Sequence, residues 1–429
     1  MREMKDSGIE WIGEIPTDWN ITTISSAFNE IKQKNENNSE TNAFSFRYGT
    51  IVKKTSIGSD EELTETFNNY TIVEPGTIMI NGLNLEFDFV TQRIAIVMQK
   101  GIITSAYLAI FPKNFVDSQF ACYLFKSYDT CKAFHSMGRG LRKTLAFNEL
   151  KRYKLIYPQK PKQQQIAAYL DSKCAEIDTI LEKTKATIEE YKKLKQSIIT
   201  QAVTKGLDSN VTMKDSGVEW IGKIPAKWVI RRFKSIATLG SGGTPASSNR
   251  DYYNGDINWV CSLDLSEKEI YQTTQKLTSL GFSNCSGTMR KINSVLVAMY
   301  GGSGTIGNSG LLKIDATTNQ AICALTFNED VCLPQFMFYY IRAIRKYWMI
   351  YAVGTRKDPN ISKDIVANMF VVLPQKREQQ QIVSYLDSKC GELDTLIDKK
   401  QQLVTELESY KKSLIYECVT GKREVPDAI

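Results

Sequence analysis

The stretch MKDSGIEWIGEIPTDW at residues 4–19 returns almost unchanged as MKDSGVEWIGKIPAKW at residues 213–228. Twelve of the sixteen positions are identical, and each copy keeps two tryptophans and one proline. Solenoid repeats recur about every 20–50 residues, so an offset of 209 residues (213 minus 4) indicates a tandem pair within this chain of 429 residues. We expect the repeated tryptophans, Trp11, Trp19, Trp220 and Trp228, to pack within a shared framework.

A second repeat follows each copy of the first. QQQIAAYLDSKCAEID at residues 163–178 recurs as QQQIVSYLDSKCGELD at residues 379–394, an offset of 216 (379 minus 163). The blocks between the repeats, 20–157 and 229–373, share little sequence. The chain therefore alternates framework and variable blocks. We predict a framework segment with a first globular domain over residues 1–158, a first spacer helix over 159–206, a repeated framework segment with a second globular domain over 207–374, and a second spacer helix with a tail over 375–429.

The second repeat predicts two long helices, over residues 163–204 and 379–420, each with two interleaved rows of residues seven apart. Such rows form a coiled-coil seam, and about 42 residues at 1.5 Å each make a rod of roughly 63 Å. The apolar residues of the seams are Leu170, Ile177, Leu181, Ile188, Tyr191, Ile198, Leu386, Leu393, Ile397, Val404, Leu407 and Leu414. We expect the two helices to pack antiparallel, although each could instead cover its own neighbouring domain. In the first half, the spacer helix is followed by the opening stretch at Met213. If the second spacer helix were followed in the same way, the next residue would be Met4. The chain therefore reads as a ring cut at one point, with a pseudo-two-fold axis between the helices.

Each variable block predicts an α+β domain of roughly 140 residues. Apolar runs bounded by turn residues predict three strands in each block, and an apolar segment after them predicts a helix. The predicted strands are 77–80, 93–99 and 104–111 in the first block and 294–300, 310–314 and 321–327 in the second; the predicted helices are 118–137 and 334–353.

Composition excludes several classes of protein. No apolar run approaches the roughly 20 residues of a membrane-spanning helix, and the N-terminus lacks the apolar core of a signal peptide. The nine cysteines form no CxxC pair, which favours reduced thiols and a cytoplasmic location. His135 is the single histidine, so a histidine metal cluster or a catalytic triad is not expected. The net charge of +7 permits a polyanionic partner without requiring one.

A basic loop follows each predicted helix: GRGLRKTLAFNELKRYK at residues 138–154 and GTRKDPNISKD at residues 354–364. Basic side chains beside Gly, Thr and Asn suit contacts with phosphates and base edges, although a solvated charged surface is the alternative. Two glycine-rich segments, GSGGTP at 240–245 and GGSGTIG at 301–307, predict a flexible loop and a loop that reaches towards a ligand; neither ends in the Gly-Lys-Ser/Thr of a Walker A motif. The candidate DNA-binding residues are Arg139, Arg142, Lys143, Thr144, Lys151, Arg152, Ser241, Thr244, Ser303, Thr305, Thr355, Arg356, Lys357 and Asn360.

These motifs together resemble the specificity subunit of type I restriction-modification systems. The resemblance rests on the doubled KDSGxEWIGxIPxxW and PQKxxQQQIxxYLDSKC motifs and on GSGGTPASSNRDYYNGDINW at residues 240–259, and it covers nearly the whole chain. It implies a non-catalytic reader of double-stranded DNA with two target-recognition domains, each reading one half of a split site. The helices would set the spacing and bind two methyltransferase subunits, and restriction subunits would join the full complex.

The residues agree with a chain that does no chemistry itself. An adenine methyltransferase needs an Asn/Asp-Pro-Pro-aromatic motif, and the nearest string, DPNI at residues 358–361, has one proline and no aromatic residue. We therefore expect no cofactor on this chain, because S-adenosylmethionine would bind the methyltransferase subunit. The alternative is a coiled-coil scaffold whose globular ends bind proteins.

Overall fold

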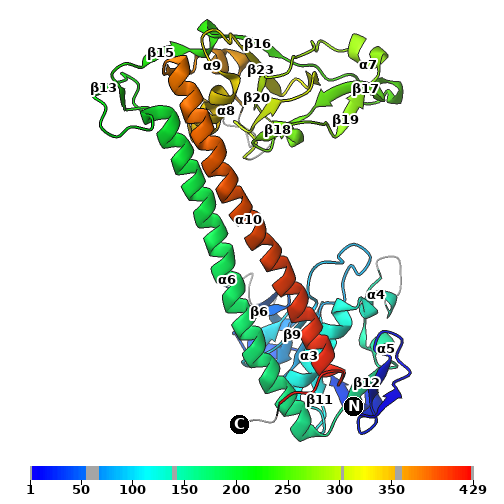
Figure 1. The fold of residues 1–429 in the computed structure, drawn as a ribbon. Coiled ribbons are helices and arrows are strands. Elements are labelled where there is room, and N and C mark those ends of the chain that lie inside the picture. The colour runs from blue at the N-terminus through cyan, green and yellow to red at the C-terminus, as the bar shows by residue number, and fades with distance from the viewer. Residues whose placement is uncertain (1, 55–66, 138–142, 301–303, 353–359, 427–429) are drawn as a thin grey trace. The chain divides into compact units, whose positions relative to one another are not determined.

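The computed structural model describes residues 2–54, 67–137, 143–300, 304–352 and 360–426. The chain divides into unit 1, residues 1–185 with 402–429, and unit 2, residues 186–401. Each unit combines β-sheets with one part of each of the two long helices, α6 (Lys160–Lys205) and α10 (Lys376–Val419) (Figure 1). The four segments proposed above follow sequence order and remain a prediction.

The main sheet of unit 1 is four-stranded and antiparallel, and apolar runs such as Ile78–Ile80 within it are fully buried. Its order is β4 (Phe28–Glu30), β11 (Leu108–Pro112), β8 (Ile78–Ile80) and β9 (Ile94–Ile96). Two-stranded sheets join β1 (Met4–Asp6) to β2 (Glu14–Pro16), β3 (Asn20–Thr23) to β12 (Lys154–Tyr157), β5 (Phe44–Arg47) to β6 (Thr50–Lys53), and β7 (Thr71–Val73) to β10 (Gly101–Ile103).

The helices of unit 1 outside the long pair are short. They are α1 (Ile24–Ala27), α3 (Ser118–Thr130), α4 (Ala133–Met137) and α5 (Phe147–Leu150). The Asp117 side chain caps α3 by accepting a hydrogen bond from the Phe120 N–H, as an N-cap residue should. The predicted helix 118–137 is therefore found, but it breaks after Thr130, where Lys132 takes a left-handed φ of 60°.

The main sheet of unit 2 has five strands, in the order β16 (Ala237–Ser241), β23 (Ile322–Phe327), β20 (Val295–Ala298), β21 (Ser309–Leu312) and β18 (Lys268–Ile270). Only the β18–β21 pair in this sheet is parallel. A three-stranded sheet orders β19 (Gln275–Leu277), β17 (Tyr253–Val260) and β22 (Thr317–Thr318). The hairpin β13 (Met213–Asp215) with β14 (Lys223–Pro225) and the pair β15 (Val229–Arg232) with β24 (Phe370–Leu373) repeat the β1–β2 and β3–β12 pairs of unit 1.

The helices of unit 2 are α7 (Ser279–Ser283), α8 (Pro334–Ala343) and α9 (Lys363–Asn368). The predicted helix 334–353 holds only for its first half, because residues Arg345–Ile350 form a 3₁₀ helix. One apolar core joins the sheet, α8 and the first turns of α10, with Trp228, Phe336 and Leu386 at most 1% exposed. A separate cluster of buried residues includes Leu296 and Ile322 of the same sheet. The expected α+β class is confirmed in both units.

The long helices pack antiparallel within each unit. In unit 1, Lys411 pairs with Asp178 at 2.6 Å and Lys185 with Glu408 at 2.8 Å, so residue numbers rise along α6 as they fall along α10. In unit 2, Lys195 pairs with Asp394. All twelve predicted seam residues are buried or half-buried; the antiparallel pairing of the helices is confirmed by the ion pairs, and the residue-by-residue seam stays a prediction.

The repeated glutamines join each long helix to its sheet domain in the same way. The Gln163 Oε1 accepts from the Asp117 N–H at 2.8 Å, and its Nε2 donates to the Phe115 and Pro158 carbonyls, both at 2.9 Å. Gln379 repeats all three bonds in unit 2, each with a partner 216 residues later. Both glutamines are fully buried, so the framework repeats in contacts as well as in sequence.

The repeated tryptophans pack as expected. Trp19 and Trp228 are each 1% exposed, and Trp11 lies edge-on to Tyr128 at 5.7 Å between ring centroids. Trp220 packs against Tyr347 at 4.9 Å. None of the helices in the described part of the chain combines the length and the apolar character that crossing a membrane requires.

Candidate nucleic-acid interface

The connection between β8 and β9 in unit 1, residues 81–93, lies against the first basic loop. We call these residues the unit 1 loop. The Leu145 N–H donates to the Gly82 carbonyl at 2.9 Å, and the Leu85 N–H donates to the Lys143 carbonyl at 3.2 Å. These bonds bring Lys143 and Thr144, both exposed, to the edge of the unit 1 loop.

The connection between β20 and β21 in unit 2, residues 299–308, holds the equivalent position, and we call it the unit 2 loop. The Ile361 N–H donates to the Met299 carbonyl at 2.9 Å. Ile361 lies 216 residues after Leu145 (361 minus 145), which is the offset of the framework repeat. Each sheet domain therefore joins a hairpin loop to a basic segment through an equivalent backbone bond.

This arrangement unites two sequence predictions in unit 2. The second basic loop and the segment GGSGTIG were predicted separately, and the bond from Ile361 to Met299 joins the described end of the basic loop to the start of the unit 2 loop. Thr305 is half-buried in the unit 2 loop, and Asn360 is exposed directly before Ile361. Six predicted residues lie outside the described ranges: Arg139, Arg142, Ser303, Thr355, Arg356 and Lys357.

Lys151 and Arg152 lie at a different place in unit 1. They follow α5, where the Lys151 Nζ donates to the Asn148 Oδ1 at 3.0 Å and the Lys151 carbonyl accepts from the Ser25 N–H at 3.0 Å. Arg152 is exposed. These contacts place the two residues beside α1, so the first basic loop supplies two groups of cations.

The segment GSGGTP is not the flexible loop that its glycines suggested. Ser241 ends β16 and pairs with Cys323, and Gly242 and Gly243 are buried. A Cβ on Gly242 would lie 1.8 Å from the Thr318 carbonyl oxygen, so only glycine fits this close approach. Ser241 is half-buried and Thr244 is exposed, which leaves Thr244 as the more accessible of these two predicted residues.

A buried arginine holds the unit 1 loop from within. Arg93 is 2% exposed, and its guanidinium donates to the carbonyls of Leu83 at 2.7 Å, Asp88 at 2.8 Å and Asn81 at 3.1 Å. Its backbone N–H donates to the Asp129 Oδ2 at 2.8 Å. Burial raises the pKa of the Asp129 carboxyl. A planar guanidinium with several fixed donors is well suited to gathering such carbonyls.

The middle of the same loop is fixed by three further contacts. The Thr91 N–H donates to the Asp88 Oδ1 at 2.9 Å, and this bond lowers the pKa of Asp88 to about 2. The His135 Nε2 lies 3.1 Å from the Asp88 carbonyl, and its ring stacks on Phe89 with 4.5 Å between centroids. His135, the single histidine of the sequence, lies in α4 and supports the loop.

The loop displays apolar side chains that the sequence analysis did not select. Phe87 is 76% exposed, Phe89 53% and Val90 94%. Lone exposed apolar residues are common, but three on one braced loop mark a contact surface. The available signal was LEFDFV at residues 85–90, in which apolar and acidic residues alternate shortly before Arg93 and β9.

A different arginine holds the unit 2 loop. The Arg345 Nη2 donates to the Gly304 carbonyl at 2.8 Å, and its Nη1 donates to the Glu267 Oε1 at 2.7 Å. Gly307 has a φ of 78°, and a Cβ there would lie 2.4 Å from the Trp348 ring. The described part of this loop is thus held closely against Arg345 and Trp348, whereas the unit 1 loop displays apolar side chains.

The chain resembles known proteins in sequence. It is 26% identical over 186 residues to the specificity subunit of the type I restriction enzyme MjaIX of Methanocaldococcus jannaschii, covering 42% of this chain and 41% of the relative. It is 23% identical over 319 residues to the specificity subunit of the Escherichia coli enzyme EcoBI, covering 69% of this chain and 63% of the relative. The chain thus spans less than two thirds of the length of either relative.

Solved structures share the fold. A chain from a structure of a type I R-M system matches with a TM-score of 0.74 at 14% identity, covering 95% of this chain and 99% of that one. The HsdS subunit of Thermoanaerobacter tengcongensis matches with a TM-score of 0.51 at 16% identity, covering 95% and 98%. The family model of the type I restriction modification DNA specificity domain matches twice, at residues 16–190 and 225–408. With both matches lying on the duplicated framework and its two sheet domains, the chain belongs to the type I restriction modification DNA specificity domain family.

Proposed function

We propose that this chain is the DNA-reading subunit of a type I restriction-modification complex, and that each sheet domain reads one half of a split DNA site. The observation that carries the proposal is the pairing of a hairpin loop with a basic segment, which occurs once in each unit at equivalent positions. The two loops differ in sequence, so they would read different bases. The alternative of a protein-binding scaffold gains no support from the family match.

The chemistry of each loop pair fits a division between affinity and specificity. Lysines and arginines of the basic segments would contact phosphates, which fix register and make binding dependent on salt. Polar and apolar side chains of the hairpin loops would contact base edges, where an apolar group can recognise the methyl group of thymine. In unit 1 the exposed Phe87 and Val90 suit that role.

The long helices would set the distance between the half-sites. Two readers on one support bind more tightly than either alone, since the second contact is intramolecular. The family resemblance implies that the helices also bind two methyltransferase subunits and that restriction subunits join the full complex. Catalysis would then belong to those partners and not to this chain.

The first test asks whether each sheet domain reads its half-site independently. Residues 20–157 are exchanged for the corresponding block of an unrelated specificity subunit. The hybrid is expressed with the methyltransferase subunit, and methylated bases are mapped across the genome. We expect one half of the methylated sequence to change and the other half to stay, with the converse result for residues 229–373. A change in both halves, or in neither, would contradict the proposal.

The spacing role has its own test. Matched insertions of four residues in α6 and α10, at positions that face each other, lengthen the pair by about 6 Å. Because base pairs repeat about every 3.4 Å, we expect the gap between the half-sites to grow by about two base pairs with unchanged half-sites. An unchanged gap would show that the helices do not act as a ruler.

A further inference from the structure

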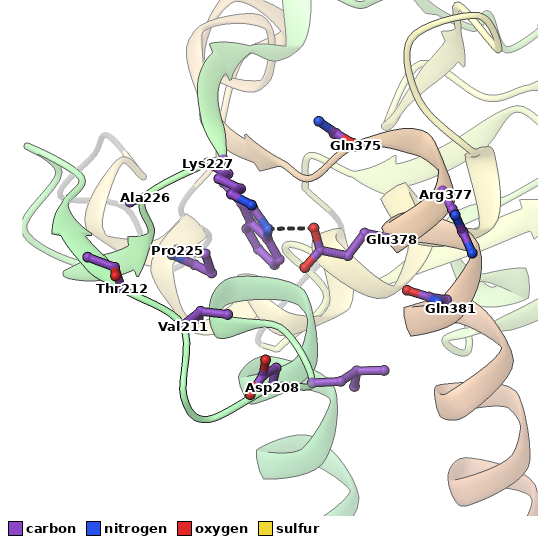
Figure 2. A pocket seen from close by; sticks show the side chains of 12 residues that line it. Asp208, Val211, Thr212, Pro225, Ala226, Lys227, Gln375, Arg377, Glu378 and Gln381 are labelled. Carbon is purple, nitrogen blue, oxygen red and sulfur yellow. Dashed lines mark hydrogen bonds between the residues drawn. The ribbon is translucent and has the colours of Figure 1, made fainter.

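Unit 2 contains a pocket of about 780 Å³ where the chain leaves α6 and returns to the framework. Its walls come from the residues after α6, from the end of the repeated opening stretch, and from the first turns of α10. In Figure 2, Glu378 and Gln381 project from α10 on one side, while Val211 and Pro225 lie on the other. We call it the Trp228 pocket, because the Trp228 side chain forms part of its wall.

Unit 1 contains the equivalent place, and there the chain itself fills it. Pro16 and Trp19 match Pro225 and Trp228 in the first repeat, and Lys162 and Gln165 match Glu378 and Gln381 in the second. The segment after α10 lies on this site. The Val425 carbonyl accepts from the Lys162 Nζ at 3.4 Å, and the Pro426 carbonyl accepts from the Gln165 Nε2 at 2.7 Å.

The filling of the unit 1 site is close. Val425 is 4% exposed. Gly421 packs against Pro16 and Trp19, and Gly206 packs against Pro225 and Trp228 in the same way in unit 2, so the two sites differ in the residues after these glycines. The site therefore holds a segment that buries Val425, continues with Pro426, and offers its carbonyls to side chains of the long helix.

The Trp228 pocket has most of the side chains that hold the segment in unit 1, but in the described residues no equivalent segment occupies it. Leu207 and Val211 are 46% and 36% exposed at its edge. Gln381 is exposed and keeps the amide donors that Gln165 uses in unit 1. Glu378 replaces Lys162, and its Oε2 accepts from the Trp228 Nε1 at 3.0 Å (Figure 2). A carboxylate at this position favours an occupant that brings an N–H group or a cation.

We propose that the Trp228 pocket binds a short extended segment of a partner protein, with a basic residue close to an aliphatic–proline pair. Gln381 would donate to its backbone, Trp228 and Pro225 would cover its aliphatic and proline side chains, and Glu378 would accept from its donor. A partner is favoured over a second copy of this chain, because each copy already holds its own segment in unit 1 at a high effective concentration. The inference does not depend on DNA reading.

The probe is a synthetic peptide with the sequence of residues 421–429, GKREVPDAI, which contains the basic residues and the Val-Pro pair. Isothermal titration of the full chain should show one equivalent of peptide bound. Gln381→Ala should weaken binding about fivefold, the usual worth of one neutral hydrogen bond, and replacing Val-Pro by Gly-Gly in the peptide should abolish it. The matched control Gln165→Ala should leave the affinity unchanged.

A chain without residues 424–429 should bind two equivalents of the peptide, because the unit 1 site is then open. Three results would overturn the proposal. The first is no binding of peptide to the full chain at millimolar concentration. The second is binding that Gln165→Ala weakens and Gln381→Ala does not. The third is self-association of the full chain that disappears on deletion of residues 424–429, since the occupant would then be a second copy.

Discussion

The unit 1 loop and the unit 2 loop hold the same position in two related sheets but are built differently. Each connects two neighbouring antiparallel strands, and each meets the basic segment through the bond made by Leu145 or Ile361. The unit 1 loop is braced from inside by its own Arg93, whereas Arg345, from the 3₁₀ helix after α8, holds the unit 2 loop. The loops thus share a location and not a mechanism of support.

The contacts of the framework, by contrast, are the same in both units. The three hydrogen bonds of Gln163 and those of Gln379 have partners 216 residues apart in every case. The bonds from Tyr123 to Asp171 and from Tyr339 to Asp387 repeat with the same offset. A constant frame with independently supported loops allows one loop to change without disturbing the other unit.

Replacing Arg93 should produce the largest loss of stability, and the loss should be confined to unit 1. Arg93→Ala leaves the carbonyls of Leu83 and Asn81 without their donor, and buried unsatisfied groups are costly. We expect unit 1 to lose about 3 kcal/mol of unfolding free energy. Native-state hydrogen exchange should show the loss in unit 1 amides.

Arg345→Ala is the matched variant in unit 2. The Arg345 side chain is 40% exposed, so its loss should cost about 1 kcal/mol and loosen the unit 2 loop. Equal losses for the two variants would refute the idea that the loops are supported by different means.

Substitutions of the two framework glutamines, Gln163 and Gln379, should lower stability equally. Gln163→Ala and Gln379→Ala each remove three hydrogen bonds from a fully buried site. We expect each to lower the stability of its own unit by about 2 kcal/mol, and the two losses to agree within about 0.5 kcal/mol. Hydrogen exchange of each unit measures both, and an effect confined to one glutamine would show that the repeated contacts differ in strength.

The residues that could be predicted from the sequence lie in the repeated framework, and those that could not lie in the variable blocks. Gln163 and Gln379, the seam residues and the tryptophans could be found, because each lies in a motif that occurs twice and their contacts follow the repeat. The break after Thr130 could not, since it depends on the left-handed backbone of Lys132 within an apolar segment that otherwise reads as one helix.

The binding loops show where such reasoning fails. Gly242 looked flexible, yet it is fixed by a carbonyl 76 residues away, at Thr318 (318 minus 242). Phe87 and Val90 were not selected, and their exposure follows from the way Arg93 holds the loop. In both cases the deciding contacts form only in the folded chain, and neither stretch belongs to a repeated motif.

Removing the exposed side chains of Phe87 and Val90 should lower the affinity for DNA and leave the free energy of unfolding almost unchanged. Phe87 and Val90 are exposed, so Phe87→Ala and Val90→Ala should change unfolding free energy by less than about 0.5 kcal/mol. If they contact bases, each should weaken binding of the assembled complex to its target by about fivefold to tenfold, a loss of about 1 kcal/mol. The substitutions should relax selectivity in only one half-site, as measured by methylation of DNAs altered in either half.

Lys143→Ala provides the comparison for that experiment. An exposed lysine that contacts phosphate should weaken binding equally for all sequences and reduce the salt dependence of the association constant. Loss of selectivity with Lys143→Ala, or a uniform loss with Phe87→Ala, would reverse the roles assigned to the two segments.

The smallest effects are expected at the symmetric ion pairs between the long helices. Lys195 with Asp394 and Lys411 with Asp178 are equivalent by the 216-residue offset, and both aspartates are about half exposed. Exposed pairs contribute little because water and salt screen them. Lys195→Met and Lys411→Met should therefore each cost about 0.5 kcal/mol or less, and the two costs should shrink together as salt is raised. A cost above about 2 kcal/mol for one lysine only would mean that the two helix segments, despite matching sequence and contacts, differ in how strongly they hold.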